Sequence, residues 1–436
     1  MLNSDQTTRQ IFQNLKEYYL NTEGVFVGAI DCLSGRKLDV QPIHEDLGDV
    51  VPFCLYYGET ELARRQVNAA LEAIRDWRFS NPRRPQWWKL DAYDWSDLLW
   101  GLIDWAESNS DRGIWKEIEL LFERWNKTFV LPNGRAVGIA VKFPIPFPLP
   151  IAMLRSVGMY PELLVRWYRI TRQEKYLRWA REIADQWLSD PFYQEFGLFP
   201  IASIGNVTTL KLICPLLVSC QKDRLYKVRV FKDNTNFVAS LFALYEETRD
   251  RQIATEIARW LQQVSSRLVD DDGGVHMEWV PGGELGRVES SSFQIIDLMC
   301  DIHRLLDSSD ALALASRVAD FWLSQQGATG LFPYYAGETA TSSDTQTDMS
   351  VALLKLAELS EEEKYYEAAL KGLQGIAKFH YYPFGMANSV DINSGKVLDT
   401  VSKTKFYALS LKGWIALENY GRLFQEATFH DLLADR

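Results

Sequence analysis

The chain has 436 residues, of which 47% are hydrophobic and 24% are charged, and this composition provides ample material for a core. It excludes global disorder, collagen and coiled coil as descriptions of the protein. The 58 acidic residues outnumber the 47 lysines and arginines and leave a formal net charge of -11, which disfavours nucleic acid as a partner.

The sequence carries no sign of a membrane span or a cofactor. No apolar run approaches the roughly 18 residues that a span needs, and the first residues are polar, unlike a signal peptide. We therefore expect a cytoplasmic protein with no membrane partner. The five cysteines form no CxxC pair, and no GxGxxG, P-loop, HExxH or GxSxG motif occurs. We expect buried free thiols, no metal and no cofactor, and the oligomeric state stays open.

An internal repeat is the most informative feature of the chain, because pairs of helical segments are joined by short polar turns. The turns lie at residues 58–61, 108–111, 171–174, 248–250, 308–310 and 360–362. Before each turn lies an apolar segment, as at 235–245, which is typical of a helix buried on most sides. After each turn lies an amphipathic segment, as at 174–188, whose first residues are acidic or polar and suit the helix dipole. Six helical hairpins are thus predicted, and a further apolar segment at 403–420 closes the series.

Long connections rich in glycine, proline and aromatic residues lead from each hairpin to the next. Buried helices that alternate with amphipathic ones, with short turns at one end and long loops at the other, predict an all-α (α/α)6 or (α/α)7 barrel. We expect residues 1–436 to form one such toroid domain. An open solenoid of helix pairs is the alternative, but it would have short loops at both ends. Because the inner helices of a barrel run parallel, their amino-terminal ends and the long loops share one rim.

With this pattern the chain resembles the six-hairpin glycosidase-like superfamily of (α/α) toroids. That superfamily includes unsaturated glucuronyl hydrolases, other glycoside hydrolases, polysaccharide lyases and sugar epimerases. The resemblance covers nearly the whole chain, through segments such as 160–188 and 342–360. It implies a carbohydrate-active enzyme, and hydrolases of the superfamily place catalytic aspartates at the starts of inner helices.

Three pairs of aspartates lie at the expected starts of inner helices. These pairs are Asp46 and Asp49, Asp94 and Asp97, and Asp344 and Asp348. A spacing of three or four residues puts both members of a pair on one helical face. Glycoside cleavage needs one acid to protonate the leaving oxygen and a second group to activate water or attack. Helix capping alone is the better explanation for any single pair, but three pairs on one rim are harder to explain by capping. We expect Asp97 and Asp94 to be catalytic, with Asp46 or Asp49 as the partner.

Aromatic side chains surround the second of these pairs. Apolar surroundings raise the pKa of a carboxyl group, as a general acid requires, and sugar rings stack on the faces of Trp and Tyr. The alternative role of such aromatics is to fill gaps between helices. The residues that we expect to contact the substrate are Trp87, Trp88, Tyr93, Trp95, His276, Glu289, Asp344 and Asp348.

Basic residues on the same rim, among them Lys232 and Lys405, could clamp the carboxylate of a uronic acid. We therefore expect a glycoside hydrolase that acts on an oligosaccharide, with a uronate-containing substrate as a preference. A sugar epimerase or polysaccharide lyase would instead use a His, Tyr or Lys base, for which His44, His276 and Tyr93 are candidates. A non-catalytic helical scaffold that binds a protein or a polysaccharide is the third alternative.

Overall fold

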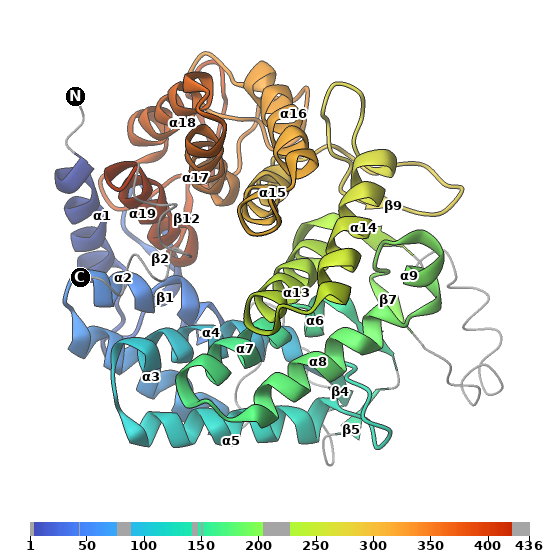
Figure 1. The fold of residues 1–436 in the computed structure, drawn as a ribbon. Helices are drawn as coiled ribbons and strands as arrows, with labels where there is room; N and C mark the ends of the chain where they lie inside the picture. The colour runs from blue at the N-terminus through green and yellow to red at the C-terminus, as the bar shows by residue number, and fades with distance from the viewer. Residues whose placement is uncertain are drawn as a thin grey trace.

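The computed structural model describes residues 4–42, 44–75, 89–141, 147–149, 151–203 and 227–420. Within these ranges, paired inner and outer helices form a ring (Figure 1). The inner helices are α2 (Val51–Tyr56), α4 (Ala92–Ser108), α7 (Tyr160–Thr171), α13 (Thr235–Thr248), α15 (Phe293–Leu306), α17 (Ser343–Ser360) and α19 (Thr404–Glu418). The outer helices are α1 (Ser4–Tyr18), α3 (Thr60–Arg75), α5 (Arg112–Phe129), α8 (Glu174–Leu188), α14 (Arg251–Arg267), α16 (Ser309–Gln325) and α18 (Glu363–Gly375).

The ring closes through its first and last described helices. Each inner helix from α4 to α19 packs against the next, and the 3-10 helix His44–Asp49 touches both α19 and α4. Helix α1 packs on α19, so the blue start of the ribbon in Figure 1 lies beside its red end. The described residues contain seven inner and outer pairs, and their closed ring confirms the predicted all-α barrel. The open solenoid is wrong.

Short strands lie in the long connections and lead into the inner helices. A three-stranded sheet joins β1 (Val27–Asp31) to β2 (Lys37–Pro42) and to β12 (Val401–Lys403), with Ala29 opposite Lys403. The other strands are β3 (Lys89–Asp91), β4 (Ile139–Val141), β5 (Phe147–Pro148), β6 (Ala152–Met153), β7 (Ala202–Ser203), β8 (Val228–Arg229), β9 (Glu278–Trp279), β10 (Ser389–Val390) and β11 (Val397–Asp399). Strands β3 and β12 run directly into α4 and α19, and β8 precedes α13 by one π-helical turn. The sheets thereby anchor the amino-terminal ends of three inner helices.

The remaining short helices are α6 (Leu154–Val157), α9 (Pro191–Phe196), the 3-10 turn Ser290–Ser292 and the π-helical turns Val230–Asn234 and Ile376–His380. No helix in the described ranges is long and apolar enough to cross a membrane. Three of the cysteines expected to be buried free thiols, Cys32, Cys54 and Cys300, are buried and free, and Cys214 and Cys220 lie outside the described residues.

The core lies between the two rings of helices. In α8, for example, the buried residues Tyr176, Ala180, Ile183 and Trp187 recur every three to four positions and form one apolar face. The largest buried aromatic side chains are Trp95, Trp105, Trp125, Trp167, Trp187, Trp260, Trp322 and Trp414, and each belongs to an inner or an outer helix. Most of the tryptophan side chains that the structure describes therefore stabilise the barrel wall.

Candidate active site

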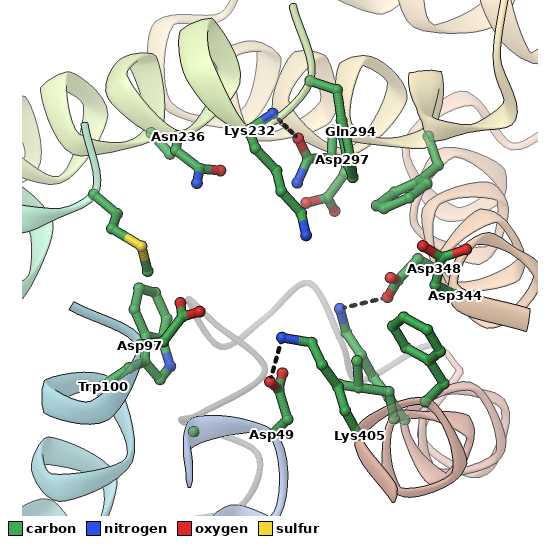
Figure 2. Close-up of a pocket in the computed structure, with 18 of the residues that line it drawn as sticks. Asp49, Asp97, Trp100, Lys232, Asn236, Gln294, Asp297, Asp344, Asp348 and Lys405 are labelled. Carbon is green, nitrogen blue, oxygen red and sulfur yellow. Dashed lines mark hydrogen bonds and ion pairs between the residues drawn. The ribbon is translucent and has the colours of Figure 1, made fainter. Parts of the chain in front are cut away.

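A cavity of about 440 Å³ lies among the inner helices and extends from their amino-terminal ends to about their middle (Figure 2). This volume falls within the roughly 300–1,000 Å³ range of small-molecule sites. Its polar lining consists of Asp49, Tyr93, Asp97, Trp100, Glu162, Lys232, Asn236, Gln294, Asp297, Asp301, Asp344, Asp348, Lys405 and Lys412. The rim that carries the long loops is thus also the end of the barrel at which charged side chains converge.

The lining residues of α4 follow the helical repeat. Tyr93, Asp97 and Trp100 are four and three residues apart and project from one face of the helix into the cavity. Helix α4 packs tightly on the 3-10 helix that carries Asp49, because a Cβ added to Gly101 would lie 2.6 Å from the backbone nitrogen of Gly48. Gly48 and Gly101 therefore allow close contact between the helix that carries Asp97 and the helix that carries Asp49.

Asp97 is a carboxyl group without a partner in the described part of the chain. The amino-terminal cap of α4 is Asp91, whose side chain accepts a hydrogen bond of 3.1 Å from the backbone N–H of Tyr93, so Asp97 does not cap the helix. Burial raises the pKa of Asp97 to about 7, and the positive charge of Lys405 opposes this rise without cancelling it. Asp97 can therefore hold or release a proton near neutral pH.

Glu162 shares these properties on the neighbouring inner helix. It is the third residue of α7, lines the cavity, and its carboxyl group has neither an ion pair nor a hydrogen bond among the described residues. Burial raises the pKa of Glu162 to about 7, although Arg166 and Arg169 act to lower it. The cavity thus contains two desolvated carboxyl groups that titrate near neutral pH.

Lys405 holds the first predicted pair of aspartates. Its Nζ lies 3.2 Å from Asp46 Oδ1 and 2.7 Å from Asp49 Oδ2. Asp49 lines the cavity, whereas Asp46 is buried beneath it and is not part of the lining. Burial raises the pKa of Asp49, and Lys405 counteracts this effect. Both members of the pair from which we expected the partner of Asp97 are therefore held by the same lysine.

Other carboxylates of the cavity are also paired with lysines. Asp348 lies 3.2 Å from the Nζ of Lys412, and Asp297 and Asp301 lie 2.8 and 2.7 Å from the Nζ of Lys355.

Asp344 has a different environment. Its carboxylate accepts a hydrogen bond from Ser342 Oγ, and no lysine or arginine pairs with it in the described residues. It lies across the cavity from Asp97 (Figure 2). Asp344 is thus a carboxylate on the opposite wall whose charge no cation neutralises.

The structure separates the predicted substrate contacts into two groups. Tyr93, Asp344 and Asp348 line the cavity, whereas Trp95, His276 and Glu289 do not. Asp94, which we expected to be catalytic, lies in the first turn of α4 but not in the lining. The prediction for Trp95 is wrong, because its ring is buried against Phe129, with the ring centroids 5.7 Å apart. Two residues along a helix turn the side chain by about 200°, so Trp95 and Asp97 face opposite directions.

His276 and Glu289 lie outside the cavity lining. The Nδ1 and Nε2 atoms of His276 lie 2.6 Å from the carbonyl oxygen of Gly286 and 2.9 Å from Asp270 Oδ2, so both ring nitrogens are engaged within a loop hairpin. Glu289 accepts hydrogen bonds from Ser291 Oγ and Tyr334 Oη, at 3.2 and 3.3 Å. Neither residue is placed to contact a ligand in the cavity.

The structure does not describe the side chains of the remaining predicted residues. Trp87 and Trp88 lie outside the described residues, and the side chain of His44 does so as well.

Sequence reasoning did not select several lining residues, among them Trp100, Glu162, Asn236, Gln294, Asp297, Asp301 and Lys412. Some of these residues could have been predicted from helical spacing. Trp100 follows Asp97 by three residues, and Asp301 follows Asp297 by four, so each lies on the face that its predecessor presents. The same rule would have favoured Trp100 over Trp95 as an aromatic side chain next to Asp97. No group of three or more metal-ligating His, Cys, Asp or Glu side chains occurs in the described ranges.

Comparison with known proteins identifies the fold. No protein-family model and no curated protein sequence matches the chain. An alpha-1,2-mannosidase from Trichoderma reesei superposes with a TM-score of 0.71 at 11% identity, over 98% of this chain and 95% of that one. A cellobiose 2-epimerase from Bacillus thermoamylovorans gives 0.60 at 10% identity, over 94% and 100% of the two chains. A D-mannose isomerase gives 0.60 at 8% identity, over 95% and 97%.

These proteins belong to the six-hairpin glycosidase superfamily that the sequence pattern resembles. At such low identity the likeness shows the fold, and it confirms the all-α toroid expected from the repeat.

Proposed function

We propose that the protein is a carbohydrate-active enzyme, and specifically a glycoside hydrolase that uses carboxyl groups of the central cavity. The observation that carries this proposal is Asp97, a desolvated carboxyl group without a partner in the described residues, whose pKa is about 7. A general acid needs a pKa near the working pH, and burial is the usual means of producing it in a carboxyl group. The toroid fold, which the chain shares with an alpha-1,2-mannosidase, supports a sugar as the ligand.

Asp97 and Asp344 supply the two functions that hydrolysis of a glycosidic bond requires. Protonated Asp97 donates its proton to the glycosidic oxygen as the bond between this oxygen and the anomeric carbon breaks. Asp344, whose charge no cation neutralises in the described residues, either accepts a proton from the attacking water or attacks the anomeric carbon itself. Lys232 lies near both carboxyl groups, because the charges of Asp97 and Asp344 both act on its pKa. All three side chains therefore face one space.

Trp100 supplies an aromatic surface in the same space. The guanidinium carbon of Arg166 lies 4.9 Å from the centroid of its ring, and Gly48 packs so closely against it that an added Cβ would lie 2.9 Å from the indole. These contacts hold the ring in place, while part of the residue lines the cavity. We propose that the C–H face of a sugar ring stacks on this indole.

The described lining disfavours the epimerase and lyase alternatives that depend on histidine. No histidine lines the cavity in the described part of the chain, and His276 is engaged in a hairpin elsewhere. Tyr93 lines the cavity, but burial raises its pKa far above neutral, which opposes a role as a base.

The test is an activity survey with analysis of the products by mass. The protein is incubated with a panel of neutral and uronate-containing oligosaccharides, and the expected product gains the mass of one water across the cleaved bond. Asp344→Asn should lower this activity by about 100-fold or more, since the second carboxylate takes part in bond cleavage. Asp271→Asn makes the same chemical change at an exposed site outside the cavity and should leave activity unchanged. Products of unchanged mass would indicate epimerisation and contradict the proposal, and so would cleavage without addition of water.

A further inference from the structure

Lys232 is a cavity lysine to which no carboxylate is paired in the described residues. Lys405 and Lys412, by contrast, are held by Asp49 and Asp348. The Nζ of Lys232 points into the cavity (Figure 2). It lies 5.1 Å from the centroid of the Phe231 ring. A half-buried cation without a counter-ion is suited to pair with a negative charge on a ligand.

The backbone holds Lys232 in a left-handed conformation, with φ 62° and ψ -20°. The other non-glycine residues with positive φ in the described ranges cap the carboxyl ends of inner helices, and they are Arg172, Arg249, Asp307 and Glu361. Lys232 instead belongs to the π-helical turn before α13, at the cavity wall. Strain of this kind persists only where the surroundings enforce it, and it is concentrated at ligand sites.

The hydrogen bonds that enforce this turn also orient Gln294. The backbone N–H of Lys232 and the hydroxyl of Thr235 both donate to Gln294 Oε1, at 3.3 and 2.5 Å. Because the amide oxygen is occupied, the Nε2 group, which can only donate, remains for the cavity that Gln294 lines. Asn236 lies on the same wall, and no hydrogen bond engages its side chain within the described residues (Figure 2).

Charged groups of both signs lie near Lys232. Burial lowers the pKa of Lys232, and Lys405 and Arg155 lower it further, whereas Asp97 and Asp344 act in the opposite direction. Near pH 7 one of these carboxyl groups, Asp97, is neutral about half of the time, because its pKa is about 7. Protonation of Asp97 therefore removes one of the negative charges near Lys232 that would oppose a ligand carboxylate.

We propose that Lys232, Asn236 and Gln294 form a binding site for the carboxylate of a uronic acid. Lys232 would supply the charge, and the two amide groups would supply hydrogen bonds. The inference rests on the proposed function, since it names the class of sugar that the hydrolase accepts. Other lining residues, among them Asp49 and Asp348 in their ion pairs with lysines, would contact the hydroxyl groups of the sugar.

Binding of matched sugars tests the proposal separately from catalysis. Isothermal titration calorimetry would compare glucuronate, galacturonate and mannuronate with glucose, galactose and mannose, and glucose 6-sulfate would distinguish a sulfate site from a carboxylate site. At least one uronate should bind at least about 10-fold more tightly than its neutral counterpart, as expected for hydrogen bonds to a charged group. Lys232→Met should abolish that preference, and Lys232→Arg should retain part of it. Neither variant changes the backbone strain, because each residue carries a Cβ atom.

Lys396→Met is the matched control, since it removes one positive charge from an exposed turn outside the cavity. It should leave both affinities unchanged, and circular dichroism should show that all variants are folded. Equal binding of uronates and neutral sugars would overturn the inference while leaving the hydrolase proposal intact. Tighter binding of glucose 6-sulfate than of every uronate would overturn the carboxylate assignment, and an undiminished uronate preference in Lys232→Met would overturn the role of Lys232. Failure of all the sugars to bind would overturn this inference, and the hydrolase proposal would fall with it only if the oligosaccharide survey also gave no turnover.

Discussion

Replacing Asp97 with Asn should impair turnover and at the same time stabilise the protein. The change keeps the size of the side chain but removes the transferable proton, and general acid catalysis typically contributes about 10²- to 10⁴-fold. We therefore expect turnover to fall by about 100-fold or more. A carboxylate that only capped a helix would behave in the opposite way, because its loss would lower stability by about 0.5 to 2 kcal/mol and leave turnover per folded molecule intact.

The gain in stability follows from the pKa of Asp97. Folding raises this pKa from 3.8 to about 7, so the folded protein binds the proton more tightly than the unfolded chain does. The wild-type protein therefore loses stability as the pH rises from about 4 to about 7, and the Asn variant does not suffer this loss. At about 1.4 kcal/mol for each tenfold change in proton affinity, the stability difference between Asp97→Asn and wild type should be about 2 to 3 kcal/mol larger at pH 8 than at pH 5.

Urea unfolding at the two pH values, combined with turnover on a substrate found in the survey, measures both effects. The exposed Asp271→Asn serves as the control and should change neither stability nor turnover. Asp104, which lies two turns further along α4, is unsuitable as a control because it forms a buried ion pair with Arg166. If Asp97→Asn retains turnover, and its stability relative to wild type is the same at both pH values, the catalytic assignment of Asp97 is refuted.

Three further predictions concern the same inner helices. Turnover should decline as the pH rises above about 7, by about tenfold per pH unit, because only protonated Asp97 donates a proton; a pH–rate profile that stays flat to pH 9 would contradict this. Glu162→Gln should gain about 2 kcal/mol more stability at pH 8 than at pH 5, since the pKa of Glu162 rises from 4.5 to about 7, and urea unfolding that gives equal gains would contradict the burial of this group. Arg166→Leu should destabilise the protein by about 3 to 5 kcal/mol in urea unfolding, because it leaves Asp104 buried without its partner at 2.7 Å, whereas Arg178→Leu on the exposed face of α8 should cost less than about 1 kcal/mol.

The sequence predicted the architecture well because the relevant signal is local and repeated. Short polar turns, apolar segments before them and amphipathic segments after them each arise within about 20 residues, and they recur around the ring. The position of the site at the rim of the inner helix starts followed from the same pattern. Asp97, Asp49, Asp344 and Asp348 could therefore be placed in the cavity from their positions along the chain.

The state of each carboxyl group depends on contacts between distant residues, and the sequence contained little information about these. Lys405 pairs with Asp46 across 359 positions of the chain, and that contact distinguishes the first aspartate pair from Asp97. Trp95 was a wrong choice for a different reason, because the prediction considered its proximity to Asp97 in the chain and not the face of α4 on which it lies. The left-handed backbone of Lys232 and the fixed amide of Gln294 depend on a hydrogen bond between the turn before α13 and the start of α15.

The proposed function depends most directly on the ionisation of Asp97 in the folded protein. Carbon NMR of protein labelled with ¹³C at the aspartate carboxyl carbons, with the Asp97 signal identified by its absence in Asp97→Asn, would give this pKa without any assumption about the substrate. We expect a titration midpoint at about pH 7, because burial in the cavity raises the pKa of Asp97. A midpoint at or below the ordinary value of about 3.8 would contradict it, because Asp97 would then be ionised at neutral pH and would have no proton to donate.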